Sequence, residues 1–81
     1  MKHIDTDKID QAVLALLYLT SEKDRFGNVH AWKGHDWDAL NRLHVRGFID
    51  DAANKNKSVN FTPEGFELAK EAFERLFMVE E

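Results

Sequence analysis

Residues 9–19 constrain the fold more than any other stretch of the sequence, because they form a predicted helix that is apolar nearly all round. Asp5 or Thr6 can cap its start by accepting hydrogen bonds from free backbone amides, and Asp7 and Asp10 lie in its first turn. A helix with apolar side chains on every face must be covered on both sides. One thin domain rarely supplies that cover, so the sequence predicts that a second subunit packs against this helix.

The remaining segments predict a mixed α+β domain. Residues 29–33 alternate in polarity like a short strand, and residues 36–46 form a second helix that ends at Gly47. Residues 48–61 predict a β-hairpin with a polar tip, and Pro63 suits the first position of a third helix. The predicted order is helix, short strand, helix, β-hairpin, helix, which is a small winged-helix-like domain with the hairpin as its wing.

Length and composition narrow the class of protein. The 81 residues allow one domain, residues 1–81, and leave little space for a deep pocket. No nucleophile stands in a recognised catalytic setting, so we expect no enzymatic activity. The chain has no cysteine, and its longest apolar run, residues 12–19, is far shorter than the ~20 residues that span a bilayer. We therefore expect a cytoplasmic protein that does not span the membrane.

The charge is unevenly distributed along the chain. The net charge of −4 argues mildly against a general nucleic-acid binder. Residues 30–60, however, carry five basic and four acidic side chains, a balance of +1, whereas residues 61–81 carry two basic and six acidic ones, a balance of −4. Any contact with an anionic partner is therefore expected in the middle of the chain.

Histidines and tryptophans in the middle segment offer two further kinds of site. His30, His35, Asp36 and His44 could be metal ligands, but they lack the short spacing typical of zinc sites, so we expect neither a metal nor a cofactor. Trp32 and Trp37 flank the sequence KGHD and, if exposed together, could form a stacking platform. Tryptophans this close to a strand and a helix start belong more often to the core, and we expect both to be buried.

Two stretches carry a resemblance to known families. Residues 40–70, LNRLHVRGFIDDAANKNKSVNFTPEGFELAK, are similar to the recognition helix, wing and exit helix of MarR- and PadR-type winged-helix regulators. The whole chain also resembles a family of short, uncharacterised bacterial proteins, through DTDKIDQAVLALLYLT, AWKGHDWDALNRLH, NKSVNFTPEG and FERLF. These resemblances imply a winged-helix-like fold and, from the first, DNA binding. Residues 21–35 do not predict the supporting helix that those regulators have.

The DNA-binding hypothesis names five residues. Asn41 and Arg42 on the second helix could reach base edges in the major groove, and Arg46 would lie along the same side. Lys55 and Lys57 at the hairpin tip could contact phosphates of double-stranded DNA. The competing interpretation is a solvated helix face together with lysines that protect an exposed strand edge from aggregation.

Two functions follow from this sequence. The first is a homodimeric DNA-binding module related to transcription. Its dimer contact would come from five side chains of the first and third helices, namely Leu14, Tyr18, Leu68, Ala72 and Val79. The second is a protein-interaction module that docks on a larger partner through its apolar first helix and binds no nucleic acid.

Overall fold

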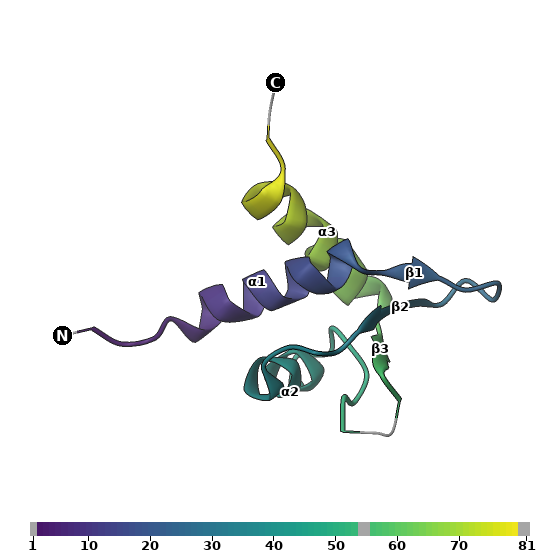
Figure 1. Cartoon of the computed structure of the whole chain (residues 1–81), viewed down its shortest axis with the longest axis horizontal. Helices are drawn as coiled ribbons and strands as arrows, with labels where there is room; N and C mark the ends of the chain where they lie inside the picture. Colours follow the sequence, from purple (N-terminus) through teal and green to yellow (C-terminus); the bar gives the residue numbers. More distant parts are fainter. Residues whose placement is uncertain (1, 54–55, 80–81) are drawn as a thin grey trace.

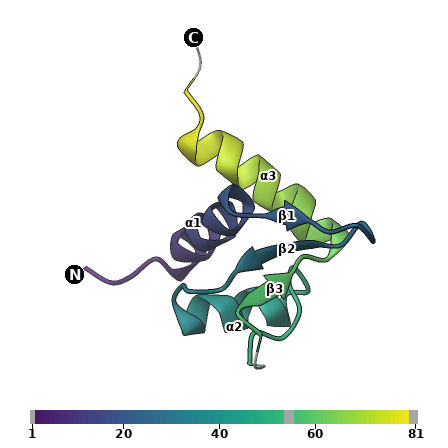
Figure 2. The same ribbon diagram turned by 45° about the vertical axis from the view of Figure 1, so that its right-hand side comes forward.

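The computed structural model describes residues 2–53 and 56–79 of the chain. Within them the helices are α1 (Thr6–Leu19), α2 (Trp37–Val45) and α3 (Pro63–Phe77), and the strands are β1 (Glu22–Lys23), β2 (Val29–Trp32) and β3 (Ser58–Asn60). Helix α1 lies in the middle, with α3 on one side and α2 and the sheet on the other (Figures 1 and 2). The predicted α+β class is confirmed.

Each helix begins where a short polar side chain can satisfy a free amide. The side chains of Asp5, Asp36 and Thr62 accept a hydrogen bond from the backbone amide three residues further on, at 3.0–3.1 Å. Beyond α2, Gly47 has a φ of +82°, which confirms the left-handed position expected of it. The Thr62 hydroxyl also donates to the Gly47 carbonyl at 2.6 Å, so the end of α2 is tied to the start of α3.

The sheet is antiparallel in the order β1-β2-β3. Strand β3 pairs mainly with β2, and Ala31 lies opposite Val59. In the described part of residues 48–61, the predicted hairpin is present only as a single bridge between Ile49 and Phe61, so the prediction of a two-stranded wing needs correction. The β-favouring run on the first side is only two residues long and meets two aspartates, which leaves too little chain for a longer ladder.

A β1-β2 hairpin pairs the predicted strand with residues 22–23, for which the sequence predicts no strand. Its turn is held by Asp24, whose Oδ1 accepts from the amides of Phe26 and Asn28 at 2.8 and 3.0 Å. Gly27 has a φ of +86°, which suits glycine at a tight turn. Strand β1 is two exposed charged residues long, so it carries no apolar alternation by which the sequence could have revealed it.

The core lies on two sides of α1. Its largest fully buried side chains come from α1, α2, the segment after α2, and β3, and are Leu17, Leu40, Leu43, Ile49 and Val59. On the opposite side, α3 presents the small residues Ala69 and Ala72 to the interior, while Tyr18 of α1 packs against the rings of Phe66 and Phe73, with centroids 5.5 and 5.2 Å apart. Most of the apolar surface of α1 is therefore covered within one chain, although Leu19 at its end is exposed.

Gly65 permits the close packing of α3 on the segment after α2. A Cβ atom at this position would overlap the backbone carbonyl of Phe48. Because that obstacle is backbone rather than a flexible side chain, only glycine allows this approach. Phe48 is thereby fixed against the start of α3.

Candidate functional site

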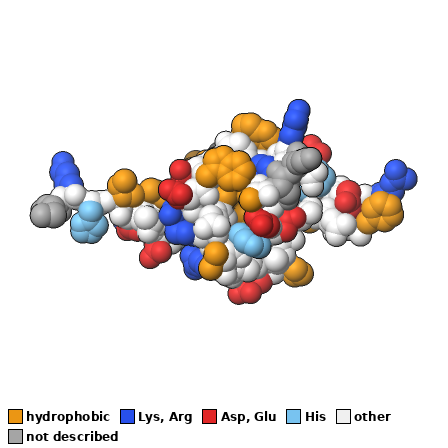
Figure 3. Space-filling model, turned by 90° about the horizontal axis from the view of Figure 1, so that it is seen from below, with side chains coloured by type: hydrophobic (Ala, Val, Ile, Leu, Met, Phe, Trp, Pro, Cys, Tyr) orange, Lys and Arg blue, Asp and Glu red, His pale blue; other side chains and the backbone are white. Residues whose placement is uncertain are grey.

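The residues predicted to contact DNA are only partly brought together. Asn41 and Arg46 are exposed at α2, and Lys57 is exposed just before β3, whereas Lys55 lies outside the described residues. Figure 3 views the molecule from the side of α2, and on the face it shows acidic and basic side chains are interspersed rather than gathered into one basic surface. That mixture is a weak match to a phosphate backbone.

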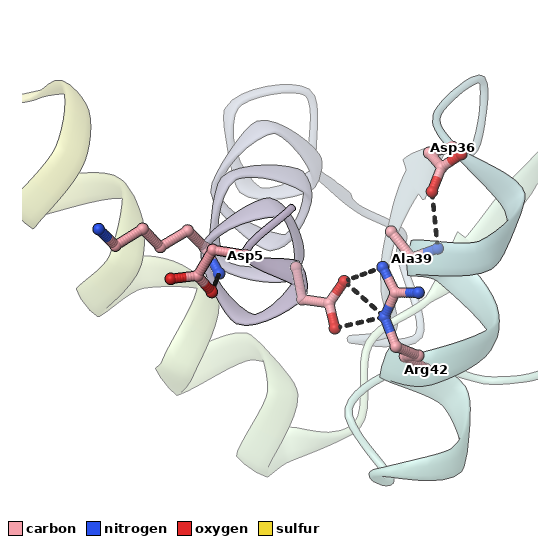
Figure 4. A network of polar contacts seen from close by, with 6 residues as sticks. Asp5, Asp36, Ala39 and Arg42 are labelled. Carbon is pink, nitrogen blue, oxygen red and sulfur yellow. Dashed lines mark hydrogen bonds and ion pairs between the residues drawn. The ribbon is translucent and has the colours of Figure 1, made fainter. Parts of the chain in front are cut away.

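Arg42 is engaged with a carboxylate of α1. Its Nε and Nη2 donate to the two oxygens of Asp10 at 2.8–3.0 Å, in a bidentate ion pair. Figure 4 shows the Arg42 guanidinium reaching from α2 towards α1, with the dashed contacts between them. The hydrogen bonds that Arg42 donates to Asp10 raise the pKa of Arg42 above its ordinary value. Base reading by Arg42 would require this pair to open.

The sequence did not predict that Asp10 forms a buried ion pair. Asp10 is only 2% exposed, and because α1 begins at Thr6, it lies beyond the first turn in which the sequence pattern placed it. Residues three, four and seven positions further on, Val13, Leu14 and Leu17, are all buried. A carboxylate on the face of this apolar stripe was the available signal for a buried ion pair.

The expectation that both tryptophans are buried is wrong. Trp32 is 58% exposed and Trp37 is 57% exposed. Ala31 in β2 and Lys33 just after it are buried, and because successive residues of an extended chain face opposite sides, Trp32 between them must point outwards. Trp37 is the first residue of α2 and lies beyond the part of that helix that the core covers.

Lys33, which lies between these tryptophans in the sequence, is buried. It is 8% exposed, and its ammonium group donates to the Ala52 carbonyl at 2.6 Å. The same ammonium lies 5.8 Å from the centroid of the Trp37 ring. Lys33 therefore joins the end of β2 to the segment after α2, and it holds the region around Trp37 in place.

The candidate metal ligands make separate contacts. His30 Nε2 is 3.9 Å from a Glu22 carboxylate oxygen, and His44 Nδ1 is 3.2 Å from the Ile49 carbonyl. His35 packs edge-on against Trp32, and its Nε2 is buried without a hydrogen-bond partner in the described part of the chain. Across residues 2–53 and 56–79, no three side chains of the metal-binding types converge.

The five residues predicted at a dimer contact differ widely in exposure. Leu14 and Ala72 are buried inside the chain, and Tyr18 and Leu68 are half-buried, whereas Val79 is 82% exposed. A dimer formed by this fold would have to use other side chains in place of Leu14 and Ala72. Beyond Phe73, the end of α3 projects away from the body (Figure 1) and exposes a continuous apolar run, Leu76, Phe77, Met78 and Val79.

The Asp10–Arg42 pair is predicted to contribute strongly to stability. Replacing Asp10 with Asn leaves the guanidinium facing a neutral amide at a buried position, which we expect to lower the melting temperature by roughly 5–10 °C. Asp7→Asn, an exposed acid in the same turn, is the control, and we expect a smaller change. Thermal unfolding followed by circular dichroism measures both variants, and equal shifts would contradict a structural role for the pair.

His35 is predicted to make stability depend on pH. Burial lowers its pKa below the ordinary value of about 6.5, so the folded chain holds the imidazole neutral while the unfolded chain takes up a proton more readily. This contribution is complete above the unfolded pKa and is lost as the pH falls through the lower pKa of the folded state. We expect urea midpoints to fall further for the wild type than for His35→Gln between about pH 7.5 and about pH 5. His3→Gln, an exposed histidine, is the control, and a parallel decline in all three proteins would contradict the prediction.

Comparisons with known proteins agree with this small, motif-poor domain. No helix in the described residues is both long and apolar enough to cross a membrane. No solved structure matches the chain, so the likeness of residues 40–70 to MarR and PadR regulators has no structural neighbour behind it. An uncharacterised protein y4hR of Sinorhizobium fredii (strain NBRC 101917 / NGR234) is 54% identical over 74 residues, which cover 91% of this chain and 95% of that protein. The model of a domain of unknown function, DUF6429, matches residues 5–79, and the chain belongs to that family, as its resemblance to uncharacterised bacterial proteins predicted.

Proposed function

We propose that this domain acts by protein–protein contact, and that its first partner is a second copy of the same chain. The observation that carries the proposal is the exposure of Trp32 and Trp37, each more than half accessible to solvent. Tryptophan is among the residues most enriched where binding energy concentrates in protein interfaces. A domain that leaves its two largest apolar side chains in water gains stability when a partner covers them.

Trp32 is held in a defined position, which favours a binding role over an accidental exposure. A Cβ atom on Gly34 would overlap the Trp32 ring, so the glycine leaves the space that the ring occupies. The ring also meets His35 edge-on, with centroids 6.0 Å apart. An anchor that is already ordered loses little conformational entropy when it binds.

The surroundings of Trp32 suit a self-complementary contact. The ring borders a shallow groove on the open face of the sheet, lined also by Thr20, Glu22, His30, Lys57 and Ser58. Glu22 and Lys57 bring opposite charges to the same groove. In a two-fold dimer the same patch meets itself, so an acidic group of one copy can face the basic group of the other. This mixture of charges suits a second copy better than it suits a nucleic acid.

Association is predicted to bury the tryptophans. We expect sedimentation to give twice the monomer mass of 9.4 kDa at high concentration, and tryptophan fluorescence to shift to the blue over the same range. Trp32→Ser should shift the equilibrium to the monomer. Phe26→Ser, which replaces an exposed ring on the β1-β2 turn, should leave it unchanged.

A double variant tests an alternative interface at the end of α3. If Phe77→Ser with Val79→Ser abolished the dimer while Trp32→Ser did not, the contact would lie at the end of α3 instead. A protein that stayed monomeric with constant fluorescence over the whole range would contradict self-association.

A second candidate function, DNA binding by a winged-helix-like domain, has one supporting observation. The chain just after β3 lies between β2 and the segment after α2, since the Phe61 amide donates to the Val29 carbonyl on one side and the Thr62 amide donates to the Phe48 carbonyl on the other. A helix followed by a strand that ends beside the segment leaving the helix is the chain order expected of a recognition helix and a short wing. Arg46 and Lys57 are the exposed cations beside it.

The DNA-binding candidate predicts a salt-dependent interaction. Fluorescence anisotropy with a labelled mixed-sequence duplex should detect binding at low salt, and the affinity should fall steeply as salt rises because bound counterions are released. Arg46→Glu with Lys57→Glu should abolish binding while helicity stays intact, whereas Arg25→Glu, on the β1-β2 turn, should change it little. No anisotropy change at micromolar protein in low salt would exclude this function.

A further inference from the structure

A small pocket lies where the three helices meet, and it has no lining residue in common with the groove beside Trp32. Its floor is apolar and comes from α1, α2, the segment after α2, and α3, through Leu14, Leu43, Phe48 and Leu68. Leu43 is 1% exposed and Phe48 is 7% exposed, so the floor belongs to the packed core. Phe48 is also fixed by the close approach of Gly65, so one wall of the pocket is formed before any ligand arrives.

Two arginines stand at the rim of this pocket, and neutral groups hold both of them. The Arg46 guanidinium lies 4.8 Å over the centroid of the Phe48 ring. Arg75 Nη2 donates to the amide oxygen of Gln11 at 2.7 Å. Neither arginine forms an ion pair with a carboxylate in the described part of the chain. Each guanidinium is therefore positioned without being neutralised, and it keeps further N–H groups for an acceptor.

Asp10 also borders the pocket, but its charge is already compensated. Both of its oxygens accept hydrogen bonds from Arg42. The lining then contains two guanidinium groups and one carboxylate, and because Arg42 from outside the lining pairs with that carboxylate, the charges of Arg46 and Arg75 remain over the apolar floor. A ligand that complements this arrangement has an anionic group for the rim and an apolar body for the floor.

We propose that this pocket binds a small organic acid, with its carboxylate between Arg46 and Arg75 and its apolar chain against Leu14, Phe48 and Leu68. The pocket encloses about 200 Å³, which is below the roughly 300–1,000 Å³ of pockets that hold drug-sized molecules. A short monocarboxylate matches that size. Its single charge also suits a site that contains a carboxylate of its own better than a doubly charged phosphate does. This inference is independent of the proposed self-association.

Titration of the full chain with hexanoate tests the proposal. Changes in the backbone amide resonances of Leu14, Phe48 and Leu68 should saturate with hexanoate. Hexanol lacks the charge and acetate lacks the apolar chain, so both should bind at least about tenfold more weakly. Equal binding of hexanol would remove the arginines from the site, and equal binding of acetate would remove the apolar floor, so either result would overturn the proposal.

Arginine variants locate the site. Arg46→Gln and Arg75→Gln should each weaken hexanoate binding by about tenfold or more. Arg25→Gln removes an arginine that also lies over a phenylalanine ring, that of Phe26, but outside the pocket, and it should bind like the wild type. Equal losses for Arg25→Gln and the two rim variants would overturn the assignment.

A short peptide with a C-terminal leucine checks the identity of the ligand. If the peptide with a free carboxylate bound more than about tenfold more tightly than hexanoate, and its amidated form did not bind, the site would take a protein C-terminus rather than a free acid. That result would overturn the small-acid assignment. Equal or weaker binding of the peptide supports it, and because the wild type alone gives this comparison, it holds even if a variant fails to fold.

Discussion

The covering of α1 is the constraint on which the rest of this structure depends. Helix α3 covers one side with the small residues Ala69 and Ala72, and α2 with the sheet covers the other. The surface of α1 that is buried on the side of α2 includes the charged side chain of Asp10, whose burial without a partner would be strongly unfavourable. Arg42 supplies that partner in a bidentate geometry, and bidentate pairing tolerates few relative orientations. The ion pair therefore fixes how α2 lies on α1, and with α2 it fixes the strand β2 that leads into it.

Local signals predicted much of this fold, and long-range pairing decided what they could not predict. Asp5, Asp36 and Thr62 cap the helices where expected, because a cap depends only on residues a few positions away. The partner of Asp10 is 32 positions distant, and no pattern within one helix identifies it. Strand β1 was not predicted for a related reason, since two charged residues become a strand only when β2 pairs with them.

The predicted partner surface likewise depended both on local sequence pattern and on long-range packing. The apolar sequence of α1 correctly indicated that the helix needs cover, but the inference of a second subunit assumed that one thin domain rarely covers both sides of such a helix. Helix α3 crosses α1 and supplies the cover, so Leu14 and Ala72 are enclosed within the chain. Exposed apolar surface occurs instead at Trp32, because the burial of Ala31 and Lys33 on one side of β2 forces the residue between them to the other side.

The arginines of this domain differ in what holds them, and that difference is more informative than the net charge. Arg42 forms an ion pair with the buried carboxylate of Asp10, so its charge is already compensated within the fold. Arg46 and Arg75 are held by a phenylalanine ring and an amide, groups that fix a guanidinium without cancelling it. The acidic excess of the chain acts at long range, where salt screens it beyond about 8 Å, whereas a ligand in the pocket would meet the two rim arginines directly. A chain with a net charge of −4 can therefore offer a locally cationic pocket, provided that the compensating groups of its rim are neutral.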